Sequence, residues 1–271
     1  MIHHVVLPKE ADQKYYATHY RFLEATARAA ELNLELRPMK EVGNTFDIEI
    51  NGKPAIIDFS DHTALRPKRA DVPYFKFHYS ERVHAGKKRI YPIGPVSFND
   101  WDEFFGLRRQ IRYEAAGETV LNCQSPDGAA TERRTQIQSF LKKTYGPLAD
   151  IEITDQSTFW RKAKDCLVAV FVPGARIDIL DRGQFQFMAF GACTISPKLD
   201  ITLPGMRPVL ANVHYMECAQ DFSNLKEIIE WARAHRTSCR EIGANASALF
   251  AETSLPWKIW GWIGGCLESE K

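Results

Sequence analysis

The sequence carries almost no net charge, and this absence excludes several classes of protein. Its 271 residues contain 35 lysines and arginines against 34 aspartates and glutamates, a formal net charge of +1 at pH 7. Proteins that coat nucleic acid or lie on anionic membranes normally have a clear basic excess. Hydrophobic residues make up 45% of the chain, an ordinary share that suffices for one large or two small folded domains. We therefore expect a globular protein whose main partner is a small molecule.

Long apolar runs and paired cysteines are also missing. No stretch approaches the roughly 20 apolar residues of a membrane span. The first residues, Met-Ile-His-His-Val-Val-Leu-Pro, lack the basic start and apolar segment of a signal peptide. The 6 cysteines are widely spaced, with no Cys-x-x-Cys pair. These absences predict a reduced, soluble, cytoplasmic protein without a structural metal site.

The first hundred residues show the pattern of a strand, a helix and a hairpin. An apolar run at residues 4–7 precedes Phe22, Ala25 and Ala29, which recur at the spacing of one helix face. Residues 46–50 alternate apolar and polar up to Asn51-Gly52, a strong two-residue hairpin signal, and an apolar run follows. We interpret residues 1–100 as a small α/β lobe on the acceptor side and residues 101–118 as its connection to the next lobe.

The rest of the chain alternates short apolar strands with helices. Residues 120–123 form the first strand, and the helix that follows stops near Gly146. Residues 166–172 are apolar throughout, as in a central parallel strand covered on both faces. Further strands are expected at 192–196 and 211–215. This alternation over residues 119–252 predicts a doubly wound, Rossmann-like sheet, and the tryptophan-rich residues 253–271 predict a terminal helix that docks across the lobes.

The expected fold class is therefore α/β, with two Rossmann-like lobes and a cleft between them. In such sheets ligands bind beyond the carboxyl ends of the strands, where loops and helix N-termini converge. The loops that follow these ends are the places to look for chemistry. They come after Phe59, Cys123, Val172, Pro197 and Tyr215.

The strongest candidate site is the stretch 178–197, Asp-Ile-Leu-Asp-Arg-Gly-Gln-Phe-Gln-Phe-Met-Ala-Phe-Gly-Ala-Cys-Thr-Ile-Ser-Pro. It resembles the C-terminal lobe of GT-B glycosyltransferases, in which a loop with Arg and Gly precedes a short helix with a Glu and then a strand. The next block runs from Val213-His-Tyr through Asp221-Phe-Ser-Asn-Leu to Ile229-Glu-Trp. It is similar to a stretch of the family 90 (CAP10-like) glycosyltransferases. The likeness covers about residues 119–250.

The resemblance implies a nucleotide-sugar donor bound in the C-terminal lobe. GT-B enzymes neutralise the donor diphosphate with helix N-termini, backbone N–H groups and basic side chains, without a required metal ion. Asp181, Arg182 and Gly183 open the short helix, where glycine permits close approach and arginine offers a bidentate fork. A turn with a surface ion pair is the alternative. Gln184 or Gln186 would contact sugar or ribose hydroxyls, although Gln186 stands where many family members have a Glu.

Two arginines and a tyrosine complete the candidate donor site. Arg133 and Arg134 open the helix after the first strand of this lobe, where positive charge opposes the helix dipole. Their position indicates either a nearby anion or a solvated helix face. Tyr215 ends a predicted strand and is expected to approach the base or ribose, with a core position as the alternative for its neighbour His214.

The acceptor side is expected in the N-terminal lobe. Transfer with inversion needs a group that takes the proton of the acceptor. Asp61 and His62 follow an apolar strand at a suitable place, although an Asp-His turn is also an ordinary loop cap. Lys76, His78 and Tyr79 form an aromatic and basic patch that would face the acceptor, and their alternation with phenylalanines equally fits a half-buried strand.

One short pattern points to a metal. Asp100-Trp101-Asp102 matches the Asp-x-Asp with which GT-A glycosyltransferases hold a divalent ion. Ser97-Phe-Asn before it and Glu103-Phe-Phe after it fit better with a capped helix start that has acids in its first turn. We therefore expect no metal and no further cofactor to be required.

These interpretations predict a glycosyltransferase that moves a hexose or pentose from a nucleotide-sugar to a hydroxyl of a glycan, a lipopolysaccharide intermediate or another lipid-linked acceptor. Two alternatives stay open. A DNA-modifying transferase acting on hydroxymethylated bases would use the basic residues between 66 and 90. A non-catalytic protein that binds nucleotides or sugars would tolerate Gln186 in place of the carboxylate.

Overall fold

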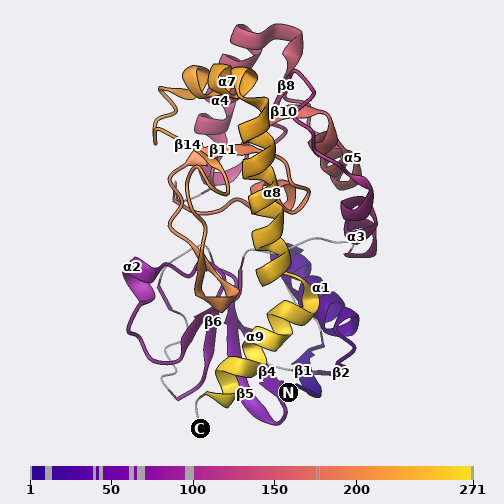
Figure 1. Ribbon diagram of the computed structural model, residues 1–271. Coiled ribbons are helices and arrows are strands. Elements are labelled where there is room, and N and C mark those ends of the chain that lie inside the picture. Colours follow the sequence, from indigo (N-terminus) through magenta and orange to yellow (C-terminus); the bar gives the residue numbers. More distant parts are fainter. Residues whose placement is uncertain are drawn as a thin grey trace. The chain divides into compact units, whose positions relative to one another are not determined.

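Both halves of the chain build a sheet with helices packed on it. The computed structural model describes residues 2–9, 14–38, 41–42, 45–60, 64–65, 71–94, 101–174, 176 and 178–269. The chain divides into two compact units (Figure 1). The first contains Met1–Trp101, Ile201–Pro208 and Glu252–Lys271, and the second contains Asp102–Asp200 and Val209–Ala251. The expected cleft between two lobes stays a prediction.

The first unit contains a mixed sheet in the order β2-β1-β4-β5-β6-β7, with β3 beside β4. β1 and β2 are parallel, the hairpin strands β4 and β5 are antiparallel, and β5, β6 and β7 are parallel to one another. The hairpin therefore interrupts an otherwise parallel arrangement. The strands are β1 (His4–Pro8), β2 (Asn33–Arg37), β3 (Glu41–Val42), β4 (Thr45–Ile50), β5 (Lys53–Asp58), β6 (Tyr74–Lys76) and β7 (Ile90–Pro92).

The turn between β4 and β5 is the one that the sequence predicts. Asn51 and Gly52 both have positive φ, 51° and 76°, as a type I′ hairpin turn requires. Asn51 also ties this turn to the first strand, because its side-chain oxygen accepts hydrogen bonds from the N–H groups of His3 and His4 at 2.9 and 3.0 Å.

Helices α1 (Lys14–Ala29) and α9 (Pro256–Glu268) pack against each other in the first unit, which also contains α2 (Glu81–His84) and the short strands β12 (Thr202–Leu203) and β13 (Arg207–Pro208). The indole N–H of Trp260 donates to Thr26 Oγ1 at 3.2 Å, and that of Trp262 donates to the carbonyl of Pro92 at 2.8 Å. Trp260 and Trp262 thus attach α9 to α1 and to β7.

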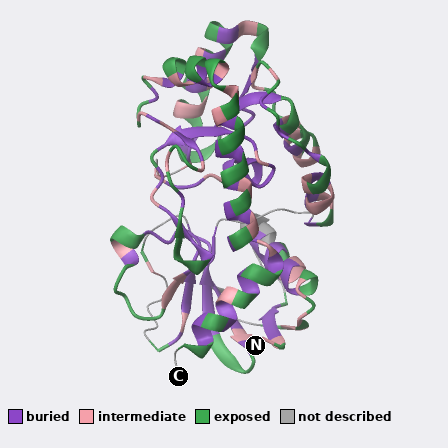
Figure 2. Ribbon diagram, in the orientation of Figure 1, coloured by how far each residue is buried: buried purple, intermediate pink, exposed green. Residues whose placement is uncertain are grey.

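The second unit contains a five-stranded parallel sheet in the order β14-β11-β10-β8-β9. Its central strand, β10, is buried at every position, as its continuous apolar sequence predicts (Figure 2). The strands are β8 (Thr119–Leu121), β9 (Ala149–Asp150), β10 (Cys166–Val170), β11 (Thr194–Pro197) and β14 (Met216–Cys218). The doubly wound parallel sheet expected for this part of the chain is confirmed.

The helices of the second unit alternate with these strands. Gly146 ends α4 with a φ of 55°, as expected of a glycine stop. The helices are α3 (Trp101–Gln110), α4 (Thr131–Tyr145), α5 (Gln156–Arg161), α6 (Arg182–Ala189), α7 (Leu225–Ala234) and α8 (Arg236–Thr253).

One predicted strand is wrong. Residues 211–215 form only an isolated bridge between Ala211 and Tyr215, and the last strand of the sheet comes directly afterwards as β14. Asn212 has a φ of 58°, a left-handed conformation that a regular strand does not contain. A short turn at residues 212–214 therefore replaces the predicted strand.

Candidate functional site

The strand order of the second unit places a switch point between β8 and β10. The chain leaves β8 through α4 toward β9 on one side, and it leaves β10 through α6 toward β11 on the other. In doubly wound sheets the loops diverge at this point and open a crevice at the carboxyl ends of the two strands. The candidate site is therefore built from the loop after β8, residues 122–130, and the described residues of the loop after β10.

A buried glutamine joins these two loops. The side-chain oxygen of Gln124 accepts from the N–H of Val172 at 2.6 Å, and its amide nitrogen donates to the carbonyl of Val172 at 3.1 Å. Asn122 donates to the carbonyl of Val170 at 3.0 Å, and Gln138 on α4 donates to the carbonyl of Gln124 at 2.8 Å. Side-chain amides thus continue the β8–β10 ladder beyond the ends of the strands. We call this arrangement of Gln124 and Val172 the amide clasp.

Arg133 and Arg134, the two predicted arginines of α4, donate hydrogen bonds to backbone carbonyls of the same two loops. Arg133 donates to the carbonyl of Gly174 at 2.6 Å, and Arg134 donates to the carbonyls of Val172 and Ser125 at 3.3 and 2.8 Å. The side chain of Arg134 is 11% exposed. The charge that opposes the helix dipole is therefore balanced by loop carbonyls within the fold, and the arginines give the site its shape.

An aspartate occupies the N-terminus of α6. Asp181 Oδ1 accepts from the N–H of Gly183 at 2.8 Å, and Asp181 Oδ2 lies 3.2 Å from Nη2 of Arg134. Arg134 also lies 3.3 Å from Asp127 Oδ1. A carboxylate of the chain thus fills the place that the sequence suggested for a phosphate, and the ion pair joins the loop after β10 to α4.

Gly183 is tightly packed. A Cβ atom there would lie 3.0 Å from the ring of Phe171 and 3.2 Å from the ring of Phe159. A side chain at this position would therefore require the two rings to shift by a few tenths of an ångström. Beside it, Arg182 is exposed at the first position of α6, and Arg176 pairs with Asp178 at 2.6 Å in the preceding loop. The exposed edge of the site therefore carries Arg182, while its neighbours support the loop.

Three other predicted donor contacts lie in the interior. Gln184 has no exposed surface and donates to Ser196 Oγ at 2.9 Å, and Gln186 accepts from the indole N–H of Trp160 at 2.9 Å. Tyr215 is 1% exposed, and its hydroxyl accepts from the N–H of Leu199 at 2.9 Å. Burial raises the pKa of Tyr215 to about 12. In this conformation these side chains position α6 and the strand ends.

One polar cluster at the ends of β8 and β9 has no signal in the sequence. Lys162 lies 2.8 Å from Asp150 Oδ2 and 3.5 Å from the sulfur of Cys123. Burial, followed by the charge of Asp150, raises the pKa of Cys123 to about 12, so the thiol stays protonated at neutral pH. The three residues are far apart in the sequence and match no motif, so only the sheet order reveals their proximity.

The predicted acceptor-side residues of the first unit are buried where they are described. Lys76 has no exposed surface, and its ammonium lies 3.0 Å from Asp58 Oδ2 and 2.7 Å from both the hydroxyl and the carbonyl of Ser60. His78 and Tyr79 are 4% and 3% exposed. All three side chains are therefore buried in the first unit: Lys76 ends β6, and His78 and Tyr79 lie just after it.

The predicted proton acceptors, Asp61 and His62, lie outside the described residues. Their anchor is nevertheless visible. Ser60 donates its N–H to Asp58 Oδ1 at 2.7 Å and accepts twice from Lys76. The chain that enters residues 61 and 62 therefore leaves from a fixed point at the carboxyl end of β5.

Metal-binding residues do not gather anywhere in the described part of the chain: it contains no group of three or more His, Cys, Asp or Glu side chains arranged to hold an ion. Asp100 of the Asp-x-Asp pattern lies outside the described residues, and α3 begins at Trp101 with Asp102 and Glu103 in its first turn. Among the described helices, none is long and apolar enough to cross a membrane.

The second unit also has a hollow of about 650 Å³ between α7, α8 and the start of β14. Trp231, Ile228 and Ile242 form its apolar walls. None of the predicted donor-binding residues lines it. It is therefore separate from the switch point.

No protein-family model matches the sequence, and no curated protein sequence does. Among solved structures, that of Anabaena HepE in complex with UDP matches with a TM-score of 0.45 and 12% identity. The match covers 69% of this chain and 60% of the HepE chain, so the chain spans less than two thirds of that protein.

Proposed function

We propose that the chain is a GT-B-type glycosyltransferase whose nucleotide-sugar donor binds at the switch point of the second unit. One observation carries the proposal. The stretch 178–197, on which the sequence resemblance rests, contains the end of the loop after β10, the whole of α6 and the whole of β11. The stretch that carries the resemblance therefore lies beside the switch point, where doubly wound sheets bind their ligands. The more specific likeness to family 90 stays part of this proposal.

The proposed donor contacts follow from which groups are exposed. Asp181 already accepts from the N–H of Gly183, and Arg182 is exposed at the first position of α6, so the diphosphate is assigned to the side chain of Arg182 and to the backbone of the loops. Arg133 and Arg134 act as positioning residues, because they hold the carbonyls of both loops. The guanidinium fork of Arg182 would neutralise the leaving diphosphate in place of a metal ion.

The proposed proton acceptor is Asp61 with His62. Asp58 is unsuited to this role, because its carboxylate is fully buried and already accepts from Lys76, Tyr74 and the N–H of Ser60. A neighbouring residue of the following loop must therefore supply the base if transfer proceeds with inversion. The acceptor is proposed to be a hydroxyl of a glycan or a lipid-linked sugar.

Donor binding is tested by isothermal titration with UDP, the nucleotide of the HepE structure, and then with GDP, ADP and CMP. Arg182→Ala should weaken binding of the nucleotide that binds by about tenfold, as expected for one charged hydrogen-bonding group. Arg109→Ala is the matched control, because Arg109 is an exposed arginine on α3 of the same unit. Unchanged affinity in the Arg182 variant would remove that residue from the site, and no binding of any nucleotide would contradict the proposal.

Transfer itself separates an enzyme from a binding protein. Release of nucleotide from a sugar nucleotide, lost in an Asp61→Asn and His62→Ala variant that still binds the donor, would support the assigned base. Binding without release or transfer would favour the non-catalytic alternative. Retention on DNA that weakens steeply with salt would favour the DNA-modifying alternative.

A further inference from the structure

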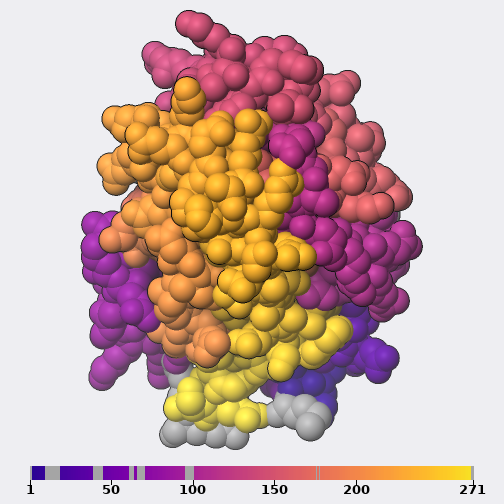
Figure 3. Space-filling model, turned by 45° about the horizontal axis from the view of Figure 1, so that its top comes forward, coloured from indigo at the N-terminus to yellow at the C-terminus, as the bar shows by residue number. Residues whose placement is uncertain are grey.

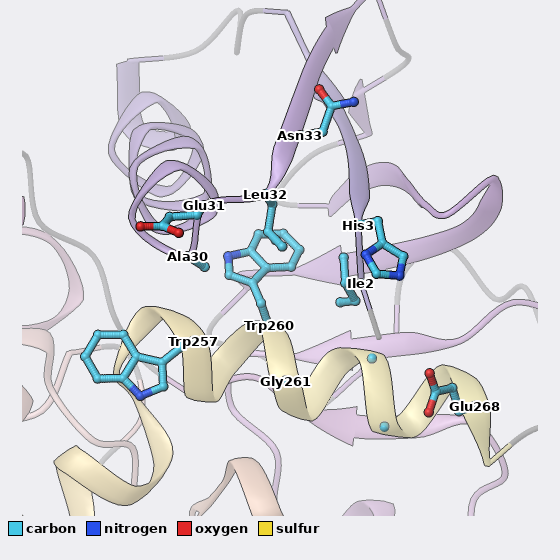
Figure 4. A pocket seen from close by; sticks show the side chains of 12 residues that line it. Ile2, His3, Ala30, Glu31, Leu32, Asn33, Trp257, Trp260, Gly261 and Glu268 are labelled. Atoms are coloured by element: carbon cyan, nitrogen blue, oxygen red, sulfur yellow. The ribbon is translucent and has the colours of Figure 1, made fainter.

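A groove of about 630 Å³ runs along α9 in the first unit (Figure 4). One wall is α9 itself, and the other comes from the turn after α1, the start of β2 and the residues Ile2 and His3. In Figure 4, Trp257 and Glu268 lie toward opposite ends of the helix, and Trp260 points across it toward Leu32. The groove is therefore long, and its direction is set by one helix.

The middle of this helix face carries no side chains. Gly261 and Gly265 are both exposed, and a Cβ atom on either would meet nothing within 4 Å. Trp257, one turn earlier, is 56% exposed. Residues spaced four apart share one face of a helix. The face thus consists of two bare backbone positions beside a large exposed aromatic ring. In Figure 3 the C-terminal segment, drawn in yellow, lies at the surface.

Charges of opposite sign stand on either side of the bare positions. Lys258 and Glu268 are both exposed, and each lies five residues, roughly 7.5 Å along the axis, from Ile263. When a second α9 lies antiparallel with its midpoint at the same residue, Gly261 faces Gly265 of the other copy and Lys258 faces Glu268. The arrangement produces both contacts twice. The face is therefore self-complementary in shape and in charge.

We infer that this groove is the docking site for a second copy of the chain, which forms a two-fold dimer through antiparallel α9 helices. Close approach of helix backbones needs small residues at the crossing point, which Gly261 and Gly265 supply. A two-fold contact requires the same patch to match itself, and the pairing of Lys258 with Glu268 meets that requirement. This inference does not depend on the proposed catalytic activity.

Sedimentation velocity of the full chain over a wide range of concentrations tests the inference. The wild type should sediment as a dimer at high concentration and dissociate on dilution. Gly261→Leu should abolish the dimer, because the side chain occupies the crossing point, while the open space around Gly261 leaves the monomer intact. Gly106→Leu is the matched control: Gly106 is also a glycine within a helix, α3, with nothing near its Cβ position, and this variant should keep the dimer.

Charge reversal tests the register of the helices. Lys258→Glu or Glu268→Lys alone should raise the dissociation constant of the dimer by about tenfold, because two symmetry-related pairs become repulsive. The double variant should restore the wild-type value. A wild type that stays monomeric at every concentration, or a dimer that Gly261→Leu leaves unchanged, would overturn the inference. A monomer that binds phosphatidylserine vesicles through Trp257 would overturn it too and assign the face to a membrane surface.

Discussion

At the scale of single residues, the first unit contains a buried ion pair between Lys76 and Asp58. The ammonium of Lys76 and the carboxylate of Asp58 are both fully buried, and each hydrogen-bonds to further groups. Removing charges from water is costly, and a buried pair offsets that cost only when its remaining donors and acceptors are satisfied. Lys76 meets this condition with three oxygen partners. Removing one member of the pair should therefore lower the stability more than removing both.

Lys76→Met should lower the free energy of unfolding by about 3–5 kcal/mol, because it leaves the carboxylate of Asp58 buried without its counter-charge. Urea unfolding followed by circular dichroism measures this. Adding Asp58→Asn should recover much of the loss, since the uncompensated charge disappears. Lys88→Met, at an exposed position of the same unit, should change the unfolding free energy by less than about 0.5 kcal/mol. Equal effects at the two lysines would contradict this account of the pair.

At the scale of elements, the amide clasp of Gln124 and Val172 joins the loops that follow β8 and β10. β8 has 3 residues and β10 has 5. Beyond their ends, the hydrogen bonds between the side chain of Gln124 and the backbone of Val172 extend the pairing of the two strands. The arginines of α4 then fix the outer parts of the same loops. The site thus depends on side chains that contact backbone, and a ligand would meet a preformed surface.

Gln124→Leu should destabilise the second unit by about 1–3 kcal/mol, because the N–H of Val172 loses its partner in a buried place, while its carbonyl keeps the hydrogen bond from Arg134. Amide hydrogen exchange at Val172 should accelerate together with this loss. Gln136→Leu on the exposed side of α4 provides the control and should leave both measurements unchanged. Slow exchange at Val172 in the Gln124 variant would show that another group holds the loop.

Elements could be predicted from the sequence where the signal is local. The Asn51-Gly52 turn, the glycine stop at Gly146 and the apolar strand β10 are each encoded within a few residues, and all three are confirmed. The clasp could not be predicted, because Gln124 and Val172 are 48 residues apart. The inward direction of Gln184 and Gln186 likewise depends on packing against distant residues, Ser196 and Trp160. The proposed roles of the site residues stay predictions.

For the whole molecule, buried thiols and phenols predict weak resistance to alkali. Burial raises the pKa of Cys123, Cys166 and Cys218 to about 12, and it does the same for Tyr145 and Tyr215. In the unfolded chain thiols ionise near pH 8.5 and phenols near about pH 10. The folded state keeps these protons up to a higher pH than the unfolded chain does. The stability that these groups contribute is therefore fully present below about pH 8.5 and is lost as the pH rises toward 12.

The free energy of unfolding, measured in urea at a series of pH values, should therefore fall with increasing slope above about pH 8.5. Each thiol that ionises only in the unfolded state contributes about 1.4 kcal/mol per pH unit to this slope. Cys166→Ala should reduce the slope by that amount, because Cys166 is buried in β10 and the variant has one titrating group fewer. A slope that the substitution leaves unchanged would show that other groups dominate the alkaline transition.

The first unit is assembled from both ends of the chain, and this has a consequence for biosynthesis. Its sheet is complete by β7, yet α9, whose tryptophans bond to Thr26 and Pro92, comes last. A ribosome makes the chain from the N-terminus, so the second unit has all its residues once Ala251 has emerged, while the first also needs residues 252–271, which are made later. The part that is made first is thus the part that is finished last, and until then the nascent N-terminal sheet lacks the helix that covers it.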